Sequence, residues 1–143
     1  MKEKISTRSA PGAIGPYAQG IRVGNLVFTS GQLPVNPDTG EMPVGIEAQA
    51  RQALKNAEAV LHAAGTGMNG VVKTTVYLKN MGDFAKVNAV YAGFFEAPFP
   101  ARTCLEAARL PKDAEIEIEC VAVIDEANKS VLEGRVMSGE IEK

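Results

Sequence analysis

The hydrophobic positions along this chain change their spacing, and each spacing predicts a different element. Residues 20–31 alternate between apolar and polar side chains on both sides of a Gly-Asn pair, a pattern typical of a β-hairpin. Over residues 46–64 the apolar positions recur every three or four residues, and a glycine follows, so this segment is expected to form a helix. Its polar side carries His62, which we expect to face solvent.

The second half of the chain predicts one more helix and three more strands. β-Branched residues over 71–78 favour a strand, an aromatic stripe over 83–96 favours a helix, and alternation returns over 101–108 and 115–124. A turn at residues 110–113 is expected to join the last two strands as a hairpin. The order is therefore β-β-α-β-α-β-β, in which two helices can cover one face of a single sheet.

The last predicted strand indicates self-association. Its isoleucine and cysteine side chains point to one side, but Val121 and Val123 make the other side apolar as well. With both helices on one face these valines would remain in water, although burying such a side chain contributes about 1.5 to 3 kcal/mol. The uncovered face is therefore expected to pack against another copy of the chain.

Composition narrows the classes of function. Hydrophobic residues make up 45% and charged residues 22% of the 143-residue chain, as in an ordinary enzyme or binding domain. The formal net charge of -2 provides no positive field for nucleic acid or anionic lipid. Two cysteines and one histidine are too few for a disulfide scaffold or a His-rich zinc site. Residues 1–7 contain no apolar signal segment and no later stretch is long enough to span a membrane, so a cytoplasmic location is expected.

Arg102 is the first candidate for ligand binding. It stands at the start of a predicted strand, two residues before Cys104, so both side chains point to one face. An ordinary surface arginine is the alternative. If it were half-buried beside Ser30 and Gly31, its planar guanidinium would instead bind a carboxylate through two hydrogen bonds. Cys104 is expected to be buried or to line a pocket, because nothing in the sequence brings His62 to it as a base.

Further candidates are acidic and phenolic. Glu115, Glu117 and Glu119 alternate with apolar residues, which fits a solvated strand face, but a carboxylate beside a pocket could also act as a general base on water. Glu117 lies in the middle and is the best placed of the three. Tyr17 follows a Gly/Pro-rich loop that could present its phenol to a ligand, although loop tyrosines more often only pack. Neither this loop nor the glycine-rich segment at residues 65–70 has the pattern of a phosphate-binding motif.

Several motifs resemble those of one protein family. Residues 100–111 read Pro-Ala-Arg-Thr-Cys-Leu-Glu-Ala-Ala-Arg-Leu-Pro, and Ile-Glu-Ile follows at 116–118. This combination resembles the C-terminal signature of the Rid family, the RidA/YjgF-like reactive intermediate deaminases. Three further motifs stand in the family's order: Ala-Ile-Gly-Pro-Tyr at 13–17, Thr-Ser-Gly-Gln at 29–32 and Val-Lys-Thr-Thr-Val at 72–76. We therefore expect a Rid-like deaminase domain over residues 1–125 and a C-terminal tail without an assigned role over 126–143.

The resemblance implies a fold, an assembly and a reaction. The implied fold is an α+β, chorismate-mutase-like subunit with a mixed sheet, assembled as a homotrimer with clefts between subunits. The implied reaction is the hydrolysis of small 2-imino or 2-enamino acids, such as 2-aminoacrylate and 2-iminobutyrate, to 2-keto acids and ammonia. The resemblance implies no metal and no organic cofactor, and the net charge argues against a nucleic-acid or membrane partner. The resemblance does imply a functional link to the PLP-dependent dehydratases that generate such compounds.

The resemblance also assigns the residues of the site. The family's carboxylate-binding arginine corresponds to Arg102, its acidic residue, which activates water, to Glu117, and its loop tyrosine to Tyr17. Its pocket-lining positions correspond to Ser30, Gly31, Asn88 and Cys104.

The two charged residues pose a geometric problem. In the expected hairpin Glu117 pairs near Ala107, which leaves Arg102 about five residues away, or roughly 17 Å at the rise of a strand. One chain would not bring the two side chains together. A site that uses both would therefore take Arg102 from one chain and Glu117 from its neighbour.

Two other functions remain compatible with the sequence. The same cleft could bind a keto acid or an amino acid without turnover, as a regulatory trimer. Some relatives have also been credited with RNA cleavage, translation inhibition or holdase-type chaperone action, although the net charge and the lack of an aromatic-basic stripe argue against RNA. The chain departs from many relatives in a shorter approach to Arg102, residues 95–100, and in its longer C-terminal end.

Overall fold

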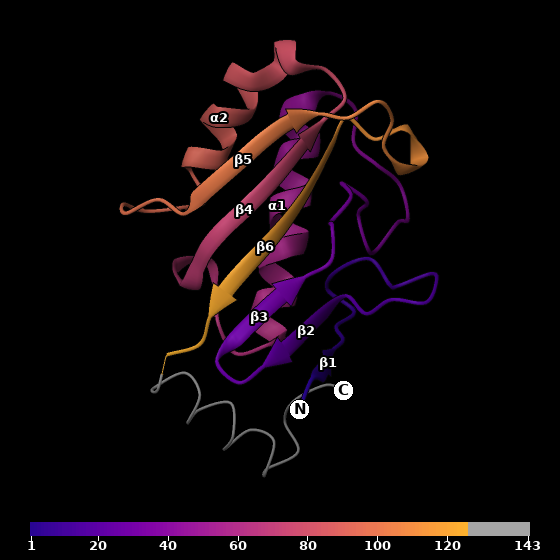
Figure 1. Ribbon diagram of the computed structural model, residues 1–143. Helices are drawn as coiled ribbons and strands as arrows, with labels where there is room; N and C mark the ends of the chain where they lie inside the picture. Colours follow the sequence, from indigo (N-terminus) through magenta and orange to yellow (C-terminus); the bar gives the residue numbers. More distant parts are fainter. Residues whose placement is uncertain (126–143) are drawn as a thin grey trace.

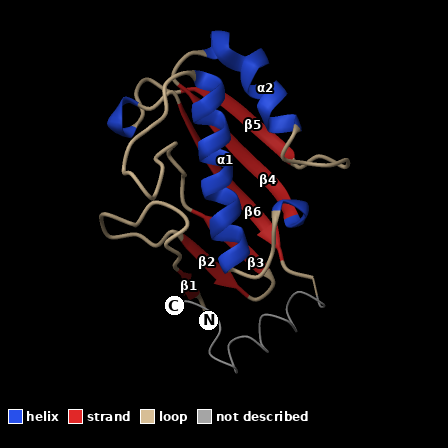
Figure 2. Ribbon diagram, turned by 180° about the vertical axis from the view of Figure 1, so that it is seen from behind, coloured by secondary structure: helices blue, strands red, loops and turns tan. Residues whose placement is uncertain are grey.

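The chain forms a six-stranded sheet with two helices packed on one of its faces (Figures 1 and 2). The structure is a computed structural model that describes residues 1–125, and the expected tail, residues 126–143, lies outside the described residues. The strands lie in the order β1-β2-β3-β6-β4-β5. In chain order the elements are β1 (Glu3–Ile5), β2 (Gly20–Val23), β3 (Leu26–Thr29), α1 (Ile46–Ala63), η1 (Met68–Gly70), β4 (Val71–Leu78), η2 (Met81–Asp83), α2 (Phe84–Ala92), β5 (Ala101–Glu106), η3 (Pro111–Asp113) and β6 (Ile116–Val123).

The sheet is mixed, as expected. β4 and β5 run parallel, whereas the other neighbouring strands are antiparallel. Parallel neighbours need a long crossover connection, and α2 supplies it between β4 and β5. Both helices lie on the same face of the sheet (Figure 2). The predicted α+β arrangement of one sheet with two helices on one face is therefore confirmed.

The long helix α1 packs closely because small residues face the sheet. Its predicted apolar stripe is buried along its whole length, together with Leu54, and His62 is exposed as expected. The facing strand contributes Gly20, where an added Cβ would lie 2.8 Å from Cγ1 of Val60. A larger residue would push the helix away from the sheet, so alanine and glycine together set the distance between the two layers.

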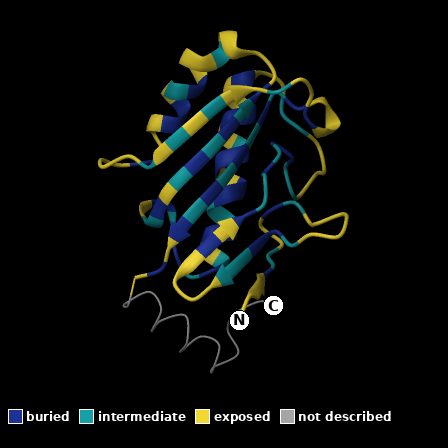
Figure 3. Cartoon of the chain, in the orientation of Figure 1, coloured by how far each residue is buried: buried dark blue, intermediate teal, exposed yellow. Residues whose placement is uncertain are grey.

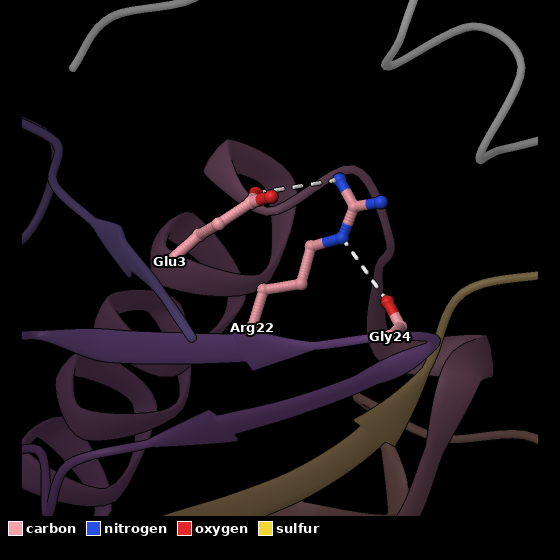
Figure 4. A network of polar contacts seen from close by, with 3 residues as sticks. All are labelled: Glu3, Arg22 and Gly24. Atoms are coloured by element: carbon pink, nitrogen blue, oxygen red, sulfur yellow. Dashed lines mark hydrogen bonds and ion pairs between the residues drawn. The ribbon is translucent and has the colours of Figure 1, made fainter. Parts of the chain in front are cut away.

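The N-terminal strand is missing from the predicted order. β1 has only three residues, too few for a periodic pattern, and it pairs antiparallel with β2 at the edge of the sheet. Ile5 anchors it in the core. Nη1 of Arg22 on β2 lies 3.9 Å from Oε2 of Glu3, and its Nε donates to the Gly24 carbonyl at 3.2 Å (Figure 4). The sheet therefore has one strand more than predicted.

The predicted hairpin between the last two strands is wrong. β6 lies in the centre of the sheet between β3 and β4, and β5 lies beyond β4 at the edge. Between β5 and β6 the chain forms η3 and passes the end of β4, where the Lys79 N–H donates to the Glu115 carbonyl at 2.9 Å. The physical reason is burial, because the doubly apolar β6 is stabilised by a central position, whereas the largely exposed β5 suits an edge.

The second helix is shorter than predicted. α2 ends at Ala92, and the residues before it form η2, where Oδ1 of Asn80 accepts a hydrogen bond from the Gly82 N–H at 2.8 Å. Beyond the helix Phe95 packs back on Tyr91, with ring centroids 4.6 Å apart. The aromatic spacing that suggested a longer helix reflects this contact.

The helices of residues 1–125 include none with the length and hydrophobicity that a membrane span requires.

The face of the sheet away from the helices carries exposed apolar side chains. Figure 3 shows exposed positions on β3 and β5, whereas β4 and β6 alternate mainly between buried and partly buried residues. Phe28 on β3 is 43% exposed although it is a large aromatic residue. Such a surface is typical of a protein that associates. We call the following group the apolar band: Val23, Leu26, Phe28 and Val123.

Candidate active site

Arg102 lies on the helix side of the edge strand β5 and is held by α2. Its Nη1 donates to Oδ1 of Asn88 at 2.7 Å, and its guanidinium carbon lies 4.8 Å from the Tyr91 ring centroid and 5.3 Å from that of Phe84. These cation–π contacts restrict the orientation of the guanidinium. The side chain is half-buried and, within residues 1–125, donates no other hydrogen bond. Its remaining N–H groups can therefore bind an anion.

Cys104 lies on the same face as Arg102, two residues further along β5. The thiol is half-buried, and burial raises its pKa, an effect that the nearby Arg102 charge only partly offsets. A protonated thiol is a poor nucleophile. His62 lines a different crevice, near the C-terminal end of α1, and cannot serve Cys104 as a base. In residues 1–125 no three His, Cys, Asp or Glu side chains converge in a way that could ligate a metal ion.

Glu117 lies on the opposite, open face of the sheet. Two backbone hydrogen bonds between Gln32 and Ile118, at 2.7 and 3.2 Å, hold the segment after β3 against β6. The Glu117 carboxylate packs directly on this segment, because a Cβ added to Gly31 would lie 2.5 Å from its Oε1. Burial, and after it the charge of Glu119, raise the pKa of Glu117. The half-buried carboxylate accepts no hydrogen bond from residues 1–125, so it is available to a ligand.

Ser30 connects this region to the loop that carries Tyr17. The Ser30 N–H donates to the Gln19 carbonyl at 2.9 Å, and its hydroxyl donates to the Ala18 carbonyl. The Gln19 side chain ties the loop further, since its Nε2 donates to the Pro11 carbonyl at 2.7 Å. The Tyr17 side chain is 51% exposed and lines a groove of about 960 Å³ beside the N-terminal segment. The loop therefore presents the phenol to solvent rather than burying it.

The sequence-predicted site residues form two groups that one chain keeps apart. β4 lies between the strands that carry Arg102 and Glu117, and the two side chains point to opposite faces. Arg102 is half-buried, as the ligand-binding alternative requires, but within one chain it does not lie beside Ser30 and Gly31. We call the first group the arginine half-site, which comprises Arg102, Asn88 and Cys104, and the second the glutamate half-site, which comprises Glu117, Gly31, Ser30 and Tyr17.

Three residues that shape the half-sites were not singled out from the sequence. Phe84 and Tyr91 flank the guanidinium, and Gln19 fixes the Tyr17 loop. A signal for the aromatic pair existed, because Phe84, Asn88 and Tyr91 follow the spacing that places three residues on one helix face. Gln19 gave no signal, since a buried glutamine in a loop has no periodic pattern.

Comparison with known proteins shows close relatives. The family model described as Endoribonuclease L-PSP matches residues 7–124. The 2-iminobutanoate/2-iminopropanoate deaminase of Escherichia coli strain K12 is 56% identical over 126 residues, which cover 86% of this chain and 98% of the relative. The 2-iminobutanoate/2-iminopropanoate deaminase of Salmonella typhimurium strain LT2 is 54% identical over the same shares of the two chains.

Solved structures share the fold. The Escherichia coli YjgF gene product aligns with a TM-score of 0.82 at 55% identity, over 85% of this chain and 98% of that chain. Escherichia coli TdcF with bound serine aligns with a TM-score of 0.83 at 48% identity, over 86% of this chain and 99% of that chain. The resemblance read from the motifs is thereby confirmed, and the chain belongs to the Endoribonuclease L-PSP family, which its Rid relatives share.

Proposed function

We propose that this protein hydrolyses small 2-imino and 2-enamino acids to 2-keto acids and ammonia. The observation that carries the proposal is the chemical complementarity of the two half-sites. Arg102 has free N–H donors that suit a carboxylate, and Glu117 has a free carboxylate that suits proton transfer. The identity of 56% to a 2-iminobutanoate/2-iminopropanoate deaminase supports the same chemistry.

The active assembly in this proposal is a homotrimer with sites between subunits. In a cyclic trimer each interface is heterologous, so that one face of a subunit meets a different face of the next. Such an interface suits two unlike half-sites that lie on opposite faces of the sheet. The exposed apolar band, with Phe28 at 43% exposure, supplies the surface that association would bury.

Arg102 would bind the substrate carboxylate. Its guanidinium offers two parallel N–H donors, and Asn88 and the aromatic rings of α2 hold it in one orientation. The backbone N–H of Gly31 of the neighbouring subunit, together with Cys104, would complete the pocket. The bound serine of the relative TdcF fits this assignment, because serine also carries a carboxylate next to a nitrogen-bearing carbon.

Glu117 would move the protons. An enamine first takes up a proton from solvent at C3 and becomes an iminium ion. The oxygen of water then bonds to C2 while Glu117 accepts a water proton, and the C=N π electrons move to nitrogen. The protonated Glu117 returns this proton to nitrogen, the C–N bond breaks, and the hydroxyl proton leaves through Glu117 to give the keto acid and ammonium. Tyr17 would close the pocket and orient the nitrogen.

This chemistry needs modest catalytic help. An iminium ion reacts with water without an enzyme, so positioning and acid–base assistance by two charged residues are sufficient. The substrates are short-lived and must be formed nearby, which links the protein to the PLP-dependent dehydratases that release enamines. We place both in the cytoplasm.

The direct test is turnover of short-lived substrates. A dehydratase would generate 2-aminoacrylate from serine or 2-iminobutyrate from threonine, and keto-acid release would be followed with and without this protein. The proposal expects faster keto-acid release, with the spontaneous rate measured in parallel and Arg102→Ala as the control. No acceleration of either compound would reject the deaminase and favour a trimer that binds small acids without turnover.

A further inference from the structure

A second carboxylate lies next to Glu117 on the open face and is fixed in position. Glu119 follows two residues later on β6, so the two side chains share a face, with backbones about 7 Å apart. The Tyr77 hydroxyl on β4 donates to Oε1 of Glu119 at 3.1 Å. The strand-register partner of Tyr77 is nevertheless Glu117. The phenol therefore reaches diagonally along the strands and holds one carboxylate beside the other.

The charge of Glu119 is not neutralised within the described chain. In residues 1–125 neither Glu117 nor Glu119 has a lysine or arginine nitrogen within 4.0 Å. Lys73 lies on the same face of β4, but its Nζ donates to Oγ1 of Thr103 at 2.8 Å, toward β5 and away from β6. A negative charge at Glu119 consequently acts on Glu117 without a local counter-ion.

The groups around Glu117 keep Tyr77 protonated and leave Glu119 as the neighbouring charge that acts on Glu117. Burial, the hydrogen bond to Glu119 and the charge of both carboxylates raise the pKa of the Tyr77 phenol, which keeps its proton and remains a donor. Burial and then the Glu119 charge raise the pKa of Glu117. Glu115, which precedes β6, does not contribute to this pKa, and Gly31, which packs on the carboxylate, brings no charge.

We propose that Glu119 is a positioning residue of the deaminase: held by the Tyr77 hydroxyl, it keeps a negative charge beside Glu117 and makes Glu117 a stronger proton acceptor. The inference rests on the proposed function, because it concerns the same proton transfer. An ordinary carboxylate is a weak base at neutral pH, and a general base works best when its pKa approaches the working pH. Glu119 supplies this basicity without touching the substrate.

The test compares two variants that remove the same charge on either side of Glu117. Glu119→Gln keeps an acceptor for Tyr77 but removes the neighbouring charge, and Glu115→Gln is the matched control. The pH profile of kcat/KM is measured for each protein, because its acid limb reports ionisation of the base in the free enzyme. We expect Glu119→Gln to move this limb to lower pH and to lower the rate at pH 7 by roughly 2- to 10-fold, as a weaker base predicts.

Glu115→Gln should keep the wild-type limb, and Tyr77→Phe should shift it in the same direction as Glu119→Gln by a smaller amount. Thermal unfolding and mass in solution verify that each variant is folded and assembled. A folded Glu119→Gln protein whose acid limb coincides with that of the wild type would overturn the proposal. So would equal shifts in the two glutamine variants.

Carboxyl ¹³C NMR separates this inference from the proposed function. A wild-type protein that does not accelerate imine hydrolysis would refute the deaminase assignment, and the charge coupling would then be judged from the titration of the Glu117 carboxyl alone. A lower titration midpoint in Glu119→Gln than in the wild type supports the coupling. An unchanged midpoint overturns it whatever the activity.

Discussion

Arg102 and Glu117 lie on opposite faces of one sheet, with β4 between the strands that carry them. Thr74 on β4 pairs with both Arg102 and Cys120, so Arg102 is level with a residue three positions beyond Glu117 on β6. Their backbones are therefore offset by roughly 10 Å along the strands and roughly 10 Å across them. A site that uses both side chains combines two copies of the chain.

Removal of the guanidinium should abolish most of the activity. Arg102→Ala leaves the substrate carboxylate without its charged partner, and losing one member of a buried charge pair costs about 2 to 5 kcal/mol, or roughly 30- to 4,000-fold in kcat/KM. Arg102→Lys keeps the charge but loses the planar pair of donors, so its activity should lie between that of the wild type and that of Arg102→Ala. Steady-state kinetics with wild-type values for Arg102→Ala would remove this residue from the site.

A methyl group at Gly31 should displace the Glu117 carboxylate, which we propose as the general base. The added Cβ of Gly31→Ala would lie 2.5 Å from Oε1 of Glu117, so the flexible side chain must move away. A displacement of about 1 Å can cost up to about 100-fold in rate, and we expect a loss in kcat with little change in melting temperature. Gly67→Ala is the control, because its Cβ would meet the His62 ring at an ordinary 3.5 Å. Equal kinetics for the two variants would contradict the role of Glu117.

Glu117 should cost stability at neutral pH. A carboxyl whose pKa is raised in the folded state binds more protons there than in the unfolded chain, so ionisation destabilises the fold once the pH exceeds its ordinary pKa. Glu117→Gln should therefore melt at a higher temperature than the wild type at pH 7 while losing activity. The difference should shrink as the pH falls below about 4, where the unfolded carboxyl is protonated as well. A Glu117→Gln variant that melts at a lower temperature than the wild type at pH 7 would argue against a raised pKa of Glu117 in the folded protein.

A charge in the apolar band should disrupt assembly and activity together. Phe28 is 43% exposed in one chain, so Phe28→Asp leaves the core intact but places a carboxylate on the surface that association would bury. We expect a folded monomer by analytical ultracentrifugation, with little imine hydrolysis. Val44→Asp, at a position 96% exposed, should remain assembled and active. A Phe28→Asp monomer with full turnover would refute a site between subunits.

Local patterns were sufficient for most elements but not for their order. The periodic alanines of α1 and the β-branched run of β4 reflect contacts that each segment makes along its whole length, so their spacing reveals them. Strand order depends instead on which strands lie in the centre. Val121 and Val123 already made the last strand apolar on both sides, the signature of a central strand, yet short separation along the chain favoured a hairpin.

The candidate site likewise combines features that local sequence patterns reveal with features that depend on the fold. The motifs made Arg102 and Glu117 candidates by resemblance, and the helical spacing that places Asn88 between Phe84 and Tyr91 was visible in the sequence. The contact between Gly31 and Glu117 was not visible, because it joins positions far apart in the chain and depends on the backbone of one against the side chain of the other. The hydrogen bond from Tyr77 to Glu119 depends likewise on the register of β4 with β6.

Mixed assemblies test the shared site most directly. Arg102→Ala and Glu117→Gln chains would each be inactive alone, and they would be co-expressed with different affinity tags and purified as hetero-oligomers. If each site takes Arg102 from one chain and Glu117 from the next, every mixed trimer of the two variants contains one intact site in three, so about a third of the wild-type turnover should return. If the mixed assemblies stay as inactive as the separate variants, both residues act within one chain or not at all, and the account is contradicted.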